Sequence, residues 1–116
     1  MAEIISSPVA ATELEPYTFV RITSAGADKA VPPDAVNGIS AKVDGVVMQN
    51  ALPLVQGSMS NIIILGVAKV KLASGQTPVP GDLVAPDASG YAVVDNTYGT
   101  YKVIRQAGEY VDVIIK

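Results

Sequence analysis

The sequence predicts an all-β fold, a small single-domain barrel or sandwich with an extended N-terminal arm. Apolar and polar residues alternate with a period of two through much of the chain, and apolar residues at helical spacing over three turns are hard to find. Turn-forming pairs such as Asp44-Gly45 and Ser89-Gly90 separate the apolar runs. The apolar residues are mainly Val, Ile, Leu and Ala, with one Phe, five Tyr and no Trp, and β-branched side chains favour strands.

The first 16 residues differ from the rest because they show no strand alternation. We therefore expect residues 1–16 to form an N-terminal arm and residues 17–116 to form the β domain. Ile4, Ile5, Pro8 and Val9 are the apolar contact residues expected in the arm. Since they have no evident place in the domain's own sheet, we expect them to pack on a neighbouring subunit or on a larger particle.

Eight candidate strands follow in order, each an apolar run bounded by turn residues. They are Tyr17–Thr23, Gly38–Val43, Gly45–Gln49, Ile62–Leu72, Leu83–Ala85, Tyr91–Val94, Tyr101–Arg105 and Tyr110–Ile115. Residues 50–61 break the pattern with Pro53 and Gly57, so they are expected to form a long loop with at most one short helical segment. Long loops often carry contacts, which makes Leu52, Pro53 and Leu54 further candidate contact residues.

Composition excludes several function classes. The chain has 116 residues, which suits one hydrophobic core, and its formal charge of −3 disfavours nucleic acid and anionic membranes as partners. It has no Cys and no His, so a thiolate nucleophile, an imidazole base and the usual zinc sites are ruled out. No apolar run approaches the roughly 20 residues of a membrane span, and the start lacks the basic region of a secretory signal. We expect synthesis in the cytoplasm, no catalysis, no metal and no cofactor.

Two sequence features suggest chemistry. Asp28-Lys29-Ala30 resembles the tripeptide that carries the modified lysine of lipoyl domains, where the lysine needs an exposed hairpin tip between firm strands. The neighbouring residues 25–27 and Val31-Pro32-Pro33 are weak strand formers, so a loop lysine is the preferred interpretation. Acidic residues near turns show no calcium-ligand spacing and are interpreted as turn residues; they are Asp82, Asp87, Asp95 and Asp112.

From about residue 36 onward, the order of elements resembles that of the capsid decoration, or cement, proteins of tailed bacteriophages. The segments that carry the resemblance are Asn37-Gly38-Ile39-Ser40, Ile64 to Lys71, Val79-Pro80-Gly81-Asp82-Leu83-Val84, Asp87 to Val93 and Ala107 to Val113. The chain departs from the family pattern in its longer Met48 to Asn61 loop and at residues 97–101.

The resemblance implies a barrel or tulip-like fold that forms homotrimers on the outer surface of a phage head. It also implies binding at threefold or quasi-threefold positions, where the trimer would bridge subunits of the major capsid protein. Two alternatives stay open. One is another virion β-domain, such as a tail tube, fibre or baseplate component, and the other is a lipoyl or biotinyl carrier modified at Lys29.

Overall fold

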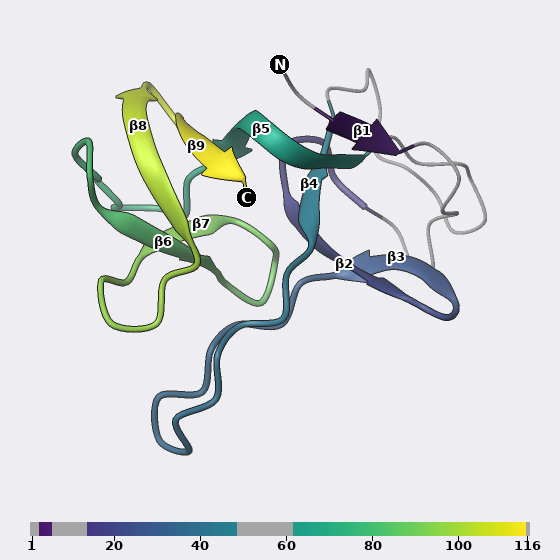
Figure 1. Ribbon diagram of the computed structural model, residues 1–116. Coiled ribbons are helices and arrows are strands. Elements are labelled where there is room, and N and C mark those ends of the chain that lie inside the picture. The colour runs from purple at the N-terminus through teal and green to yellow at the C-terminus, as the bar shows by residue number, and fades with distance from the viewer. Residues whose placement is uncertain (1–2, 6–13, 49–61, 116) are drawn as a thin grey trace.

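Nine strands form one continuous curled sheet in the computed structural model, which describes residues 3–5, 14–48 and 62–115 (Figure 1). Every strand ladder is antiparallel, and the described residues contain no helix, hence none that could cross a membrane. The strands are β1 (Glu3–Ile5), β2 (Phe19–Thr23), β3 (Gly26–Lys29), β4 (Gly45–Val47), β5 (Ile62–Lys71), β6 (Leu83–Pro86), β7 (Ala92–Val94), β8 (Tyr101–Ala107) and β9 (Tyr110–Ile115). The all-β prediction is confirmed.

Strand β5 joins two halves of the sheet. Its first residues pair with β4 on one side and with β1 on the other, and its stretch from Gly66 to Lys71 pairs with β9. Gly66 has φ +104°, a conformation that only glycine adopts easily. The order β3-β2-β4-β5-β9-β8-β6-β7 is therefore nearly symmetric about β5, with a hairpin at each end.

The core spans both halves. Phe19 of β2 and Tyr101 of β8 stack with ring centroids 5.6 Å apart, and both side chains are buried. Alternation in β2 and β4 sends Phe19 and Val46 into this shared cluster, whereas Val20 and Val47 enter a second cluster on the other face. Both faces of the first half are therefore covered, and side-chain packing as well as backbone pairing holds the two halves together.

Seven of the eight predicted strands are present, with ends shifted by a few residues. The prediction of a strand at Gly38–Val43 is wrong, because that segment makes only the isolated bridges Val31 to Lys42 and Asp34 to Ile39. Strand β3 was not predicted, since Gly26 and Ala27 are weak strand formers. It forms because a tight turn pairs it with β2, in which the Thr23 hydroxyl accepts from Ala25 N and donates to Gly26 O.

The N-terminal segment also differs from expectation. Residues Glu3–Ile5 lie in the domain's own sheet as β1, with Ile4 opposite Ile63 and Ile5 opposite Ile62. The argument that Ile4 and Ile5 have no place in this sheet is thus wrong, because β5 offers a free edge that an apolar segment can fill. Leu14, also within the expected arm, is only 1% exposed in the second cluster.

Five predicted contact residues and the expected long loop at 50–61 lie outside the described residues. These contact residues are Pro8, Val9, Leu52, Pro53 and Leu54.

Gly45 tests the packing of β4 against β5. A Cβ at this position would lie 2.5 Å from Ile63 O and 2.6 Å from Ile62 Cγ2, and the first of these atoms belongs to the backbone. We expect Gly45→Ala to lower the free energy of unfolding by about 2 kcal/mol or more, measured by urea denaturation.

Gly75→Ala is the control, because a Cβ there meets nothing within 4 Å although φ is +80°. It should cost about 1 kcal/mol, the price of a left-handed backbone alone. Equal losses in the two variants would contradict close packing at Gly45.

Candidate interaction surfaces

Residues 30–44, between β3 and β4, leave the body of the protein as a narrow projection, the projecting arm (Figure 1). Two pairs of backbone hydrogen bonds hold its sides together. Val31 and Lys42 exchange bonds of 3.0 Å each, and Asp34 and Ile39 exchange bonds of 2.9 and 2.8 Å. The arm is a preformed hairpin whose two sides are joined by two isolated bridges and not by a continuous strand ladder. It takes the place of the strand expected at residues 38–43.

The tip of the arm is locked by Asp34. Its carboxylate accepts hydrogen bonds from Val36 N at 3.1 Å, Asn37 N at 3.3 Å and Asn37 Nδ2 at 2.7 Å. These bonds, with that of the Asn37 side chain foremost, lower the pKa of Asp34 below its usual value. Gly38 then turns the chain with φ +66°. The tip thus keeps its shape, and its carboxylate stays ionised, at neutral pH.

Apolar side chains are displayed along the arm. Val36 at the tip is 94% exposed, Ile39 is 50% exposed and Val31 is 37% exposed. These side chains add little to the core of one chain and are available for contact with another molecule. The sequence contained the signals of this projection in Pro32-Pro33 and Asn37-Gly38, although the alternation of residues 38–43 favoured a strand.

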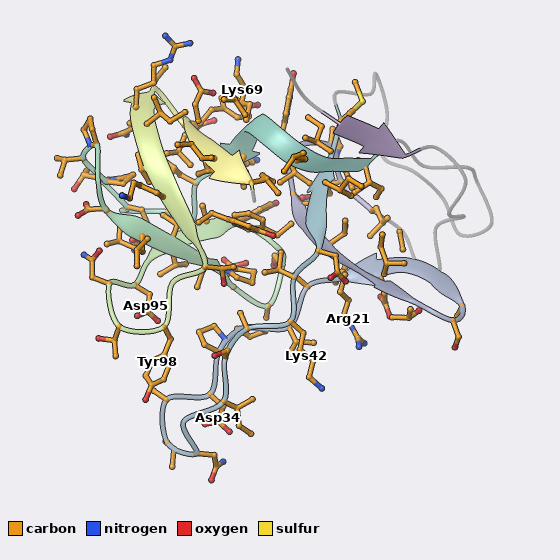
Figure 2. The ribbon with its side chains drawn as sticks, viewed as in Figure 1. Arg21, Asp34, Lys42, Lys69, Asp95 and Tyr98 are labelled. Atoms are coloured by element: carbon orange, nitrogen blue, oxygen red, sulfur yellow. The ribbon has the colours of Figure 1, made fainter. Side chains whose placement is uncertain are left out.

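A recess lies where the arm joins the body. Its volume is about 300 Å³, and its walls come from Val43, Leu83, Thr100, Tyr101, Lys102 and Ile114. The base of the arm is fixed in direction, because Asp44 Oδ2 accepts from Ile22 N at 2.7 Å and Asp44 N donates to Val20 O at 2.8 Å. In Figure 2, Lys42 lies near the body and Asp34 lies far out along the arm.

The outward surface of β5, β9 and β8, the outer face, carries four basic side chains. Lys69 and Lys71 lie on β5, and Lys102 and Arg105 on β8. Asp112 on β9 stands between the basic strands and pairs with Arg105 at 2.6 Å. The outer face therefore has a formal charge of +3, while the remaining four basic and ten acidic residues give the rest of the chain −6.

Two lysines of the outer face make cation–π contacts with tyrosine rings. Lys69 Nζ lies 6.0 Å from the Tyr17 ring and 5.7 Å from the Tyr110 ring, and Lys71 Nζ lies 5.2 Å from the Tyr91 ring. Such contacts hold the ammonium groups in place while leaving them in solvent. The outer face is suited to bind an acidic protein surface.

Lys29 does not have the geometry of a carrier lysine. It is the last residue of β3, whereas the β2–β3 hairpin turns at residues 24–25. Its side chain borders a shallow recess of about 180 Å³ with Leu14, Glu15, Thr18, Ser89 and Tyr91. The requirement for a lysine at a hairpin tip is not met.

Three of the four acidic residues considered in the sequence hold turns through backbone N–H groups. Asp82 accepts from Val79 N at 3.0 Å, Asp87 from Ser89 N and Tyr91 N at 2.8 and 2.9 Å, and Asp95 from Thr97 N and Tyr98 N at 3.0 and 2.8 Å. The fourth, Asp112, is the partner of Arg105. Within residues 3–5, 14–48 and 62–115, no group of three acidic residues could hold a metal ion.

Comparison with known proteins finds one related sequence and two similar structures. No protein-family model matches the chain. The uncharacterized protein MJ0336 of Methanocaldococcus jannaschii is 33% identical over 98% of each chain. A chain in the capsid of Myoviridae phage XM1 matches all of this chain with a TM-score of 0.72 at 15% identity, over 84% of its own length. The head fiber gp8.5 N base of bacteriophage phi29 matches with a TM-score of 0.58 at 16% identity, over 95% of its length. Because both structures are less than 25% identical to this chain, the likeness shows that they share its fold and nothing further.

The contact between Tyr91 and the N-terminal segment gives stability a pH dependence. The Tyr91 hydroxyl donates to Glu15 Oε2, and this bond, followed by burial and the charges of Glu15 and Asp87, raises the pKa of Tyr91 to about 12. A raised folded-state pKa adds stability below the unfolded value near 10, and this stability is lost as the pH rises toward 12.

Urea unfolding between pH 9 and 11.5 should therefore show that the free energy of unfolding falls as the pH rises, and that it falls less in Tyr91→Phe. The control Tyr98→Phe should follow the parent protein. Identical pH profiles for the parent and Tyr91→Phe would contradict the role of this contact.

Proposed function

The chain belongs to the same family as MJ0336 of Methanocaldococcus jannaschii, and from its fold we propose that it is a capsid decoration, or cement, protein of a virus head. The observation that carries this proposal is the likeness of the whole chain to two phage head proteins. In this role the protein binds the outer surface of the head as a homotrimer at threefold or quasi-threefold positions. There it bridges subunits of the major capsid protein.

The two surfaces described above support a structural role. An exposed apolar hairpin and a basic sheet face offer binding area, and the acidic residues near turns are engaged in holding the backbone. A trimer that contacts several shell subunits at once gains from effective concentration, so weak individual contacts add up to firm attachment. Binding that favours the intact shell over its separated subunits then stabilises the shell by mass action.

We propose that the outer face is one surface that meets the shell. Its formal charge of +3 contrasts with the acidic remainder of the chain, so an acidic patch on the major capsid protein would orient the decoration protein with this face inward. Ile4, Ile5, Pro8, Val9, Leu52, Pro53 and Leu54 remain proposed contact residues for the shell or a neighbouring subunit.

The likeness to the base of a head fiber favours a second candidate, the base of a fibre on the head. Sedimentation separates the remaining roles. A decoration protein or fibre base travels with purified heads, and a tail component travels with purified tails. A carrier would instead show a mass increase on Lys29 in its native host.

Decorated heads should withstand heat better than heads that lack the protein. The measurement is the rupture temperature of the two kinds of head, followed by release of their nucleic acid, with occupancy checked by gel densitometry. Adding the purified protein back should restore the higher temperature. Equal rupture temperatures at full occupancy would remove the cement role.

Charge reversal tests the outer face. Lys69→Glu should weaken binding to heads by about tenfold or more, with a reduced dependence on salt, because it removes a basic group and places a second acid beside Asp112. The control Lys42→Glu makes the same change of charge at an exposed residue of the projecting arm, outside β5, β8 and β9. Equal binding by the two variants, with both melting as the parent does, would exclude the outer face from the shell contact.

A further inference from the structure

Two features of the chain are complementary but cannot meet within one molecule. The tip of the projecting arm displays Val36 beside the ionised Asp34, and the recess at the base of the arm has apolar walls and Lys102. We propose that the arm tip of one copy seats in the recess of a second copy. Val36 then packs against Val43, Leu83 and Ile114, and Asp34 faces Lys102, so that Lys69, Lys71 and Arg105 of the outer face remain for the shell. This contact deepens the proposed function, because it names the surface through which copies associate.

The arm cannot fill its own recess. Val43 lies in the recess wall, and the return side of the arm runs from Ile39, next to the turn at the tip, to Val43. At about 3.3 Å per residue these four residues place the tip about 13 Å along the arm from that wall. The bridges Val31 to Lys42 and Asp34 to Ile39 keep the arm extended, and Asp44 fixes its base. The tip is therefore held away from the recess and is presented to another molecule.

Charge complementarity favours a second copy as the occupant. Residues 30–41 of the arm contain one charged side chain, Asp34, and the recess contains one, Lys102. The Asp34 side chain is partly exposed and, because its pKa is lowered, ionised at neutral pH, so it can accept from an ammonium group while keeping its bonds to the tip. Every copy carries both the tip and the recess, and no further protein is needed to complete the contact.

The rigidity of the arm makes such a small contact effective. Its turn and its base are ordered before binding, so little conformational entropy is lost when the tip docks. The contact joins two different surfaces of the same chain. It can therefore be exchanged between two copies or passed around a ring, and the trimer proposed above is one such ring.

Disulfide trapping tests the contact directly, because the chain has no cysteine. Val36→Cys, placed at the tip, is mixed with a differently tagged Thr100→Cys, placed in the exposed part of the recess wall. Mild oxidation should yield a disulfide-linked pair of unlike tags, identified by mass spectrometry. The control is Val79→Cys mixed with Thr100→Cys, since Val79 is 59% exposed on a turn outside the arm. A yield no higher than that of the control, or a dominant link between two tips, would overturn the proposal.

A second variant tests the energy of the contact without oxidation. Val36→Asp places a carboxylate in the apolar recess and should weaken self-association by about tenfold or more, measured by light scattering across a concentration series. Val79→Asp should leave self-association unchanged, and both variants should keep the circular dichroism of the parent. Unchanged association of Val36→Asp would overturn the arm contact.

Binding to heads separates this inference from the proposed function. A protein that binds heads but yields no disulfide between positions 36 and 100 refutes the arm contact alone. A protein that yields this disulfide but does not bind heads refutes the decoration role alone.

Discussion

The backbone pairing of β5 is the interaction on which the rest of the structure depends. This strand donates to and accepts from β1 and β4 through its first residues and from β9 through the remainder. Gly66, where the pairing changes partners, adopts a φ that would strain any other residue. The two halves of the sheet are thereby fixed relative to one another, and the stacked rings of Phe19 and Tyr101 close the space between them.

This frame also places the two candidate interaction surfaces. The outer face exists because β5, β9 and β8 are adjacent and alternate in the same register, which brings Lys69, Asp112 and Arg105 into one row. The recess exists because the base of the arm, beside β4, approaches the start of β8 and the end of β9. Binding surfaces of this kind arise from the order of strands in the sheet, so no short sequence motif predicts them.

The sequence predicted the strands well where alternation and burial agree. In β9, Val111, Val113 and Ile115 are buried and the residues between them are not, and alternation alone identified this strand. The alternation criterion failed at residues 38–43, where Ile39 and Ala41 alternate with polar residues but no neighbouring strand is available to pair with them. It also failed at β3, where pairing with β2 overrides the weak strand propensity of Gly26 and Ala27. The recess could not be predicted, since its walls come from segments as distant as Val43 and Ile114.

The near symmetry of the sheet about β5 has a consequence for local stability. In the second half, β8 pairs with β9 from Lys102 to Ala107. In the first half, β2 pairs with β4 only at Phe19 and Val20, because the chain between β3 and β4 leaves the sheet as the projecting arm. Fewer ladder bonds must break to open the first half, so its amide hydrogens should exchange with solvent faster than those of β8 and β9. The half that carries the arm is thus the one that opens more readily in a single copy.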